Sequence, residues 1–113
     1  DLWFEDPSGV TIVDYKTGHA GPALMSEYRL QLQIYSLALR AIAGGAPVRA
    51  CLFLLESGMQ VEVETGGDAE RRVMSAIAQF RSAASNGGYP MKPGTVCGYC
   101  PYWKSVCPGA GAD

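Results

Sequence analysis

Two strand-like runs separated by a tight-turn sequence open the chain and constrain its fold more than any other feature. Residues 1–16 read DLWFE, DPSG and VTIVDYK, and the turn has Asp first, Pro second and Gly fourth, the type I preference. A two-residue loop places Asp1 opposite Asp14, whereas a three-residue loop with a bulge places Asp1 opposite Tyr15. The pattern therefore predicts a β-hairpin and leaves its register open between these two pairings.

Helix and strand patterns alternate along the rest of the chain. Ser26 is the predicted N-cap of a helix over about residues 27–43, which a Gly-Gly pair ends. The runs VRACLFLLE and MQVEVE predict two strands, the first buried on both faces and the second nearer an edge. A second helix is predicted over about residues 68–85. This order predicts an α/β fold, with a core at residues 1–88 and a tail at residues 89–113.

The first predicted helix carries polar residues in a spaced arrangement. Gln31 and Tyr35 are four residues apart and so share a face, near Tyr28. A second stripe of apolar side chains is predicted to be buried as well: Leu30, Ile34, Leu37 and Ala41. The helix is thus expected to bury most of its surface while it presents an amide and a phenol together.

Acidic and basic side chains meet at the end of the second hairpin strand. Lys16 projects from the same face as Asp14, because strand side chains alternate, and Asp1 joins that face in the two-residue register. Opposed carboxylates need a compensating cation, and two carboxylates suit Mg²⁺, which also binds a substrate phosphate. Lys16 would then orient the attacking water or stabilise the transition state. The alternative is a surface hairpin in which Lys16 merely pairs with a neighbouring acid.

Composition limits the partners of the chain. The net charge of −2 argues against a stand-alone nucleic-acid binder, which needs clustered Lys and Arg to meet phosphates. No charged leader and no apolar run of membrane-spanning length is seen, so the sequence predicts no membrane partner and a cytoplasmic protein. Because the first residue falls within a predicted strand, we expect an N-terminally truncated domain whose exposed sheet edge favours self-association.

The order of these motifs resembles a known nuclease superfamily. Asp1 before an apolar strand, then IVDYKTG, then a Q-x-x-x-Y arrangement is similar to the PD-(D/E)XK superfamily, and most closely to its RecB-like branch of RecB-, AddA- and AddB-type nuclease domains. The resemblance implies a restriction-endonuclease-like core, a central mixed sheet flanked by helices. It also implies that Asp1 and Asp14 bind Mg²⁺ or Mn²⁺ and that Lys16 assists the nucleophilic water. Gln31 and Tyr35 would support the site.

Three crowded cysteines near the C-terminal end extend the resemblance. Cys97, Cys100 and Cys107 resemble the cysteine triplet of AddB-like and CRISPR-adaptation nucleases, in which a fourth cysteine completes a [4Fe-4S] site. Three thiolates cannot close a four-cysteine site alone, so the resemblance implies a fourth cysteine outside this chain. Cys51 is the other candidate, although a cysteine in an apolar strand is expected to be a small hydrophobe. Zinc is the alternative metal for the triplet.

The function that the resemblance implies is that of a metal-dependent DNA exonuclease, which hydrolyses phosphodiester bonds during DNA double-strand-break repair or recombination. Its partners would be DNA and a helicase, either a module of the same polypeptide or a separate protein, and the isolated chain is expected to be incomplete for activity. Two alternatives stay open. One is a catalytically inactive nuclease-like scaffold that binds DNA or a partner, and the other is a CRISPR-adaptation nuclease.

Overall fold

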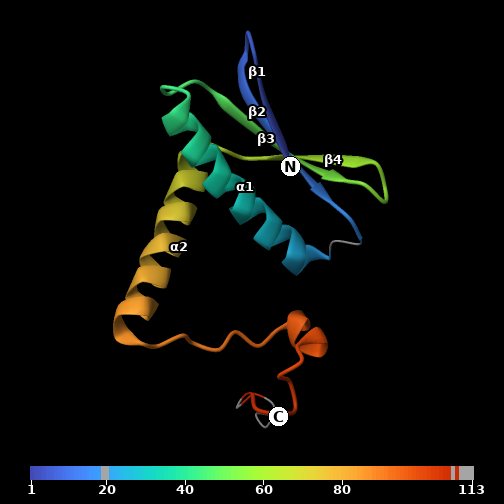
Figure 1. Cartoon of the computed structure of the whole chain (residues 1–113), viewed down its shortest axis with the longest axis vertical. Helices are drawn as coiled ribbons and strands as arrows, with labels where there is room; N and C mark the ends of the chain where they lie inside the picture. The colour runs from blue at the N-terminus through green and yellow to red at the C-terminus, as the bar shows by residue number, and fades with distance from the viewer. Residues whose placement is uncertain (19–20, 108, 110–113) are drawn as a thin grey trace. The chain divides into compact units, whose positions relative to one another are not determined.

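A four-stranded mixed sheet backed by one long helix forms the first structural unit of the chain, residues 1–78 (Figure 1). The residues described by this computed structural model are 1–18, 21–107 and 109. The strands run in the sheet order β1 (Leu2–Asp6), β2 (Gly9–Lys16), β3 (Val48–Leu54) and β4 (Met59–Val63). Helix α1 (Pro22–Ile42) links β2 to β3, which pair in parallel, while the other neighbours are antiparallel. The predicted α/β class and mixed sheet are confirmed.

The β1–β2 hairpin turns through a two-residue loop. Asp6 pairs with Gly9, and continuation of this ladder places Asp1 opposite Asp14. Ser8 fastens the turn, because its backbone N–H donates to the Asp6 carboxylate over 2.7 Å and its hydroxyl donates to the same oxygen. The hydroxyl and the amide of Ser8 together lower the pKa of the Asp6 carboxyl. The two-residue register is confirmed, and the bulged alternative is wrong.

Helix α1 begins earlier than the sequence pattern predicts. Gly21 is its N-cap and Pro22 its first residue, whereas Ser26 lies inside the helix and is exposed. Proline suits this position because its φ is already helical and its missing N–H would have no partner in the first turn. The helix ends before Gly44 and Gly45, as predicted, and both adopt positive φ, +63° and +88°.

The face of α1 that packs on the sheet is not the apolar stripe that the sequence predicts. Ile34 of that stripe is 40% exposed, and Ala41 is exposed as well. The buried residues of α1 are instead Leu32, Gln33, Ser36 and Leu39. Two of these are polar, so hydrophobicity alone does not reveal the face. The strand residues that complete the core cluster are Val10, Ile12, Val48, Ala50, Leu52 and Val63.

The second structural unit comprises residues 79–113. Helix α2 (Gly67–Asn86) runs from the first unit into it and matches the second predicted helix. A short 3₁₀ turn, η1 (Thr95–Tyr99), follows in the predicted tail, whose residues 108 and 110–113 lie outside the described part of the chain. Among the helices that the structure describes, none has the length and apolar character needed to cross a membrane.

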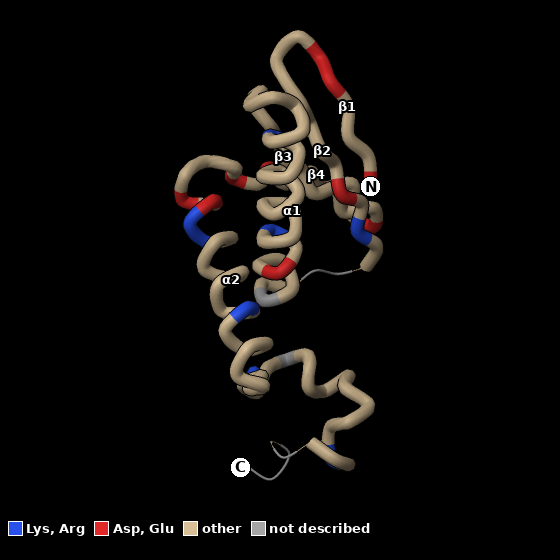
Figure 2. The backbone as a smooth tube through the Cα atoms, turned by 60° about the vertical axis from the view of Figure 1, so that its left-hand side comes forward, with Lys and Arg blue, Asp and Glu red and all other residues tan. Residues whose placement is uncertain are grey.

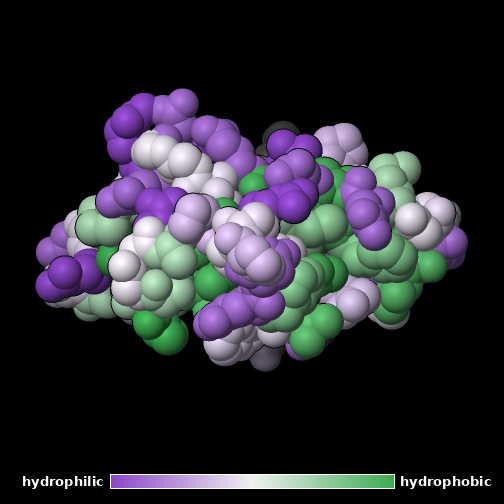
Figure 3. Space-filling view, turned by 90° about the horizontal axis from the view of Figure 1, so that it is seen from above, coloured by the Kyte–Doolittle hydropathy of each residue, from purple (hydrophilic) through white to green (hydrophobic). Residues whose placement is uncertain are grey.

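Strand β1 forms an edge of the sheet with an exposed surface. All of its side chains are exposed, including those of Leu2, Trp3 and Phe4. On the face seen in Figure 3, hydrophobic residues likewise reach the surface among hydrophilic ones. Charged residues of both signs are interspersed along the backbone in Figure 2 and do not gather in one basic stretch.

Candidate active site

Strand β2 carries two charged residues of the candidate site at its carboxyl end. Asp14 follows Val10 and Ile12 on the strand face that packs against α1, because side chains alternate along the strand. Asp14 is 1% exposed, and its Oδ2 lies 2.8 Å from Lys16 Nζ. Parallel pairing with β3 sets Asp14 beside the fully buried Leu52. The carboxylate therefore lies within the apolar core.

The buried carboxylate of Asp14 is not satisfied by hydrogen bonds. Among the described residues, neither Oδ1 nor Oδ2 accepts a hydrogen bond, and the Lys16 contact is an ion pair by distance whose angles fall short of a hydrogen bond. A buried charge without donors destabilises the fold, so such a group marks a candidate functional site. Oδ1 has no partner among these residues and is available to a ligand.

Helix α1 contacts the ammonium group of Lys16. The ammonium donates to Gln31 Oε1 over 3.1 Å, and Gln31 Nε2 donates to the Tyr35 hydroxyl over 2.9 Å. Gln31 and Tyr35 lie about one helical turn apart, so the amide and the phenol share one helix face. The structure thus joins Asp14, Lys16, Gln31 and Tyr35 in one chain of polar contacts.

An aromatic ring makes a further contact, one that no sequence motif indicated. The centroid of the Tyr28 ring lies 4.7 Å from Lys16 Nζ, within the range of a cation–π interaction. Tyr28 precedes Gln31 by three residues and therefore lies on the same helix face. It is half-buried and packs against the core cluster. The spacing from Gln31 was a signal that Tyr28 belongs with the site, but only the packing of α1 on β2 shows the contact with Lys16.

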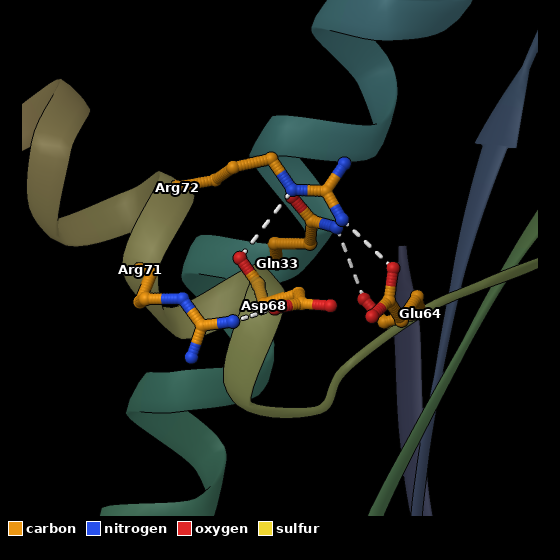
Figure 4. A network of polar contacts seen from close by, with 5 residues as sticks. All are labelled: Gln33, Glu64, Asp68, Arg71 and Arg72. Atoms are coloured by element: carbon orange, nitrogen blue, oxygen red, sulfur yellow. Dashed lines mark hydrogen bonds and ion pairs between the residues drawn. The ribbon is translucent and has the colours of Figure 1, made fainter.

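A polar network fixes α1 against the segment that follows β4 (Figure 4). The buried Gln33 donates from Nε2 to the backbone carbonyl of Glu64 over 3.0 Å. The Glu64 carboxylate accepts from Arg72 Nη2 over 2.7 Å, and Arg72 Nε donates to the Asp68 carbonyl over 3.4 Å. Arg71 pairs with the Asp68 carboxylate. Because Gln33 lies in the middle of α1, this network helps to set the position of the helix on the sheet.

Comparison with known families gives this geometry a context. The family model described as the PD-(D/E)XK nuclease superfamily matches residues 1–108. The chain belongs to this superfamily. Its mixed sheet and two helices form the α/β, restriction-endonuclease-like core that the resemblance implied. Nucleases of the superfamily typically use divalent metal ions.

Two curated relatives match about half of the chain. Each is described as the first of the lettered subunits of an ATP-dependent helicase/nuclease, one from Desulforudis audaxviator and one from Acetivibrio thermocellus. Over 62 residues they are 39% and 31% identical to the chain, and each alignment covers 51% of the chain. The chain aligns with only about 5% of the length of these relatives, so it compares with a small part of each.

Asp1 is the predicted residue of the superfamily site that the structure does not join to the others. It precedes β1 and is exposed, and within the described part of the chain no hydrogen bond or ion pair links it to Asp14 or Lys16. Its register position puts the two carboxylates on one sheet face. No group of three or more His, Cys, Asp or Glu side chains that could hold a metal ion occurs among the residues with described structure.

The cysteines of the tail lie in the second unit. Cys97 and Cys107 are half-buried and line one small hollow together with Trp103, whereas Cys100 is exposed. The Gly94 N–H donates to Cys97 Sγ over 3.3 Å, a bond that favours negative charge on the sulfur. The structure therefore brings two of the three predicted ligands to one hollow, and the described residues contain no three-residue metal cluster there.

Proposed function

We propose that this chain is the catalytic part of a metal-dependent DNA nuclease that hydrolyses phosphodiester bonds. The observation that carries the proposal is the buried Asp14 carboxylate, which accepts no hydrogen bond from the described residues and lies 2.8 Å from Lys16. A buried charged group without donors is tolerated where a ligand satisfies it. Membership of a nuclease superfamily gives that ligand a chemical class, a divalent metal ion together with a phosphodiester.

Asp14 and Asp1 are the residues proposed to hold Mg²⁺ or Mn²⁺. Mg²⁺ typically uses one or two protein carboxylates, keeps several waters and binds a substrate phosphate. The open Oδ1 of Asp14 fits this donor set, because it is a carboxylate oxygen with no other partner among the described residues. When bound, such an ion neutralises charge on the phosphodiester and lowers the pKa of water.

Lys16 is proposed to position the attacking water or to stabilise the phosphate in the transition state. Its ammonium has three N–H donors, and the contacts with Asp14 and Gln31 account for two of them. The third is left for a water or a phosphate oxygen, where a fixed cation stabilises developing negative charge. Gln31 is itself held by Tyr35, so the ammonium needs little reorganisation during the reaction.

We further propose that the nuclease acts as an exonuclease, coupled to a helicase in the cytoplasm, in DNA double-strand-break repair or recombination. The support is the similarity to two relatives described as parts of an ATP-dependent helicase/nuclease. With a net charge of −2 and interspersed charges (Figure 2), the chain is poorly suited to hold DNA by electrostatics alone. Much of the DNA affinity would therefore come from the coupled helicase.

Substitution of the site residues in the complete natural polypeptide tests the nuclease proposal. Asp14→Ala and Lys16→Ala should each abolish Mg²⁺-dependent cleavage of linear DNA while the melting temperature is largely kept. Glu62→Ala is the matched control and should cleave as wild type, because Glu62 is an exposed carboxylate of the same sheet, paired with Arg49 over 3.7 Å. Undiminished cleavage by Asp14→Ala would overturn the proposal. A titration without Mg²⁺ or Mn²⁺ binding would favour a scaffold that binds DNA without cutting it.

We also propose that Cys97, Cys100 and Cys107 bind a [4Fe-4S] cluster together with a fourth cysteine from outside the chain. The support is the hollow shared by Cys97 and Cys107 and the N–H bond to the Cys97 sulfur. Cys51 is the internal alternative, half-buried on β3 with its Sγ 3.5 Å from the Leu52 carbonyl oxygen. Iron and zinc assays, with an absorbance spectrum near about 400 nm, separate the two metals. Cys107→Ser should lose the metal, and Cys51→Ser should keep it.

A further inference from the structure

The Lys16 ammonium is held between strand β2 and helix α1. It lies 2.8 Å from Asp14 Oδ2, donates to Gln31 over 3.1 Å and lies 4.7 Å from the centre of the Tyr28 ring. Asp14 comes from the same strand, whereas Gln31 and Tyr28 come from α1, within about one helical turn of each other. The Lys16 side chain is accordingly only 19% exposed.

The carboxylate contact of Lys16 is the one that metal binding would weaken. Asp14 is the proposed metal ligand, and a carboxylate whose charge is shared with a divalent cation attracts a lysine less strongly. Lysine has a flexible four-carbon stem and loses much rotamer entropy when it is fixed. A contact that does not depend on Asp14 is therefore needed to keep the ammonium in place during the reaction.

The ring of Tyr28 provides a contact of this kind. The face of an aromatic ring attracts a cation through its quadrupole, and the attraction grows when the pair is shielded from water. The ring carries no net charge, so it does not repel the phosphate of a DNA substrate as a further carboxylate would. The half-buried position of Tyr28 against the core also fixes the ring relative to the sheet.

We propose that Tyr28 is a positioning residue that holds the Lys16 ammonium through the face of its ring. This inference rests on the proposed nuclease function and extends it, since Tyr28 lies outside both the D-x-K and the Q-x-x-x-Y motifs. The ring and not the hydroxyl makes the contact with Lys16. Phenylalanine should therefore substitute for Tyr28, whereas leucine, which has no π system, should not.

The ring contact itself is tested by NMR on the 113-residue chain without substrate. Nuclei above an aromatic face resonate at lower frequency, so the Lys16 methylene protons next to Nζ should be shifted from their position in a short solvated peptide. The shift should persist in Tyr28→Phe and vanish in Tyr28→Leu. An unshifted Lys16 in the wild-type chain would overturn the inference, whether or not the leucine variant folds.

The catalytic consequence is tested in the complete natural polypeptide. Tyr28→Leu should lower kcat about tenfold with KM little changed, as expected for loss of a partly desolvated cation–π contact, and Tyr28→Phe should keep the wild-type kcat. Tyr15→Leu is the matched control, because Tyr15 adjoins Lys16 on β2 but its ring packs on Phe53, 5.8 Å between centroids, on the other sheet face. Wild-type kcat in Tyr28→Leu, or an equal loss in Tyr15→Leu or Tyr28→Phe, would overturn the inference.

Lys16→Ala separates failure of this inference from failure of the proposed function. If Lys16→Ala leaves cleavage intact, the nuclease role of Lys16 fails, and a positioning role for Tyr28 fails with it. If Lys16→Ala abolishes cleavage while Tyr28→Leu cleaves as wild type, the nuclease role stands and only the role of Tyr28 is lost.

Discussion

The Lys16 ammonium on β2 donates a 3.1 Å hydrogen bond to the side-chain oxygen of Gln31 on α1. This bond ties the end of the strand to the helix that backs the sheet, so the position of Lys16 depends on how α1 packs. The helix is in turn held by its core residues and by the bond from Gln33 to the carbonyl of Glu64. Substitutions that move α1 are therefore expected to affect the site even when they lie away from Lys16.

Removal of the Gln31 amide should cost more activity than removal of the Tyr35 hydroxyl. Gln31→Leu deletes the acceptor for Lys16, whereas Tyr35→Phe deletes only the acceptor for the Gln31 amide. In steady-state cleavage assays we expect kcat to fall about tenfold or more for Gln31→Leu and only a few-fold for Tyr35→Phe. A larger loss for Tyr35→Phe would indicate that the hydroxyl contacts the substrate directly.

Neutralisation of Asp14 should abolish metal binding without destabilising the fold. The carboxylate is 1% exposed and accepts no hydrogen bond from the described residues, so its charge opposes folding until a ligand binds. The wild-type chain should melt at a higher temperature when Mg²⁺ is added. Asp14→Asn should melt at a similar or higher temperature than wild type in metal-free buffer and show no response to Mg²⁺. A much lower metal-free melting temperature would mean instead that the pair with Lys16 is structural.

The buried Gln33 should contribute more to stability than the exposed Arg72. Gln33 is 4% exposed and donates to the Glu64 carbonyl, so Gln33→Leu leaves that carbonyl without its partner. We expect the free energy of unfolding, measured with urea, to fall by about 1–3 kcal/mol. Arg72→Ala breaks an ion pair whose two side chains are more than half exposed and should cost about 1 kcal/mol or less. The reverse order would contradict this account of how α1 is held.

Gly9 should not tolerate a side chain. Its φ is +130°, and a Cβ atom there would lie 2.4 Å from the Pro47 carbonyl oxygen. Gly9→Ala should therefore lower the free energy of unfolding by about 1–3 kcal/mol. Gly66→Ala is the matched control, since a Cβ at Gly66 meets no atom within 4 Å. Similar urea midpoints for the two variants would show that the hairpin relaxes around the added methyl group.

Local patterns were sufficient to predict the strands and the polar contacts of the candidate site. The D-P-S-G turn indicated the hairpin, and strand alternation placed Asp14 and Lys16 on one face, where the structure pairs them. The spacing of Gln31 and Tyr35 placed their side chains together, and the two are hydrogen-bonded. These relationships depend on residues close in sequence, and for that reason a sequence pattern can predict them.

Relationships that depend on packing could not be predicted in this way. Helix α1 begins at Pro22, because a proline fits the first turn, although Ser26 has the residue type of an N-cap. The buried face of α1 includes Gln33, whose amide is satisfied by a carbonyl far along the chain, so a hydrophobic pattern assigns it to the surface. The contact of Tyr28 with Lys16 exists only once α1 lies on β2.

The two-residue loop between β1 and β2 constrains the length of the chain more strictly than its composition. Because strand side chains alternate, one residue added to the loop would slip β1 by one position and turn Asp1 to the opposite sheet face. Asp14, Lys16 and Gln31 would keep their contacts, and every motif residue would still be present in the sequence. Among copies of this domain, loop length could therefore distinguish a hairpin that presents both carboxylates together from one that separates them.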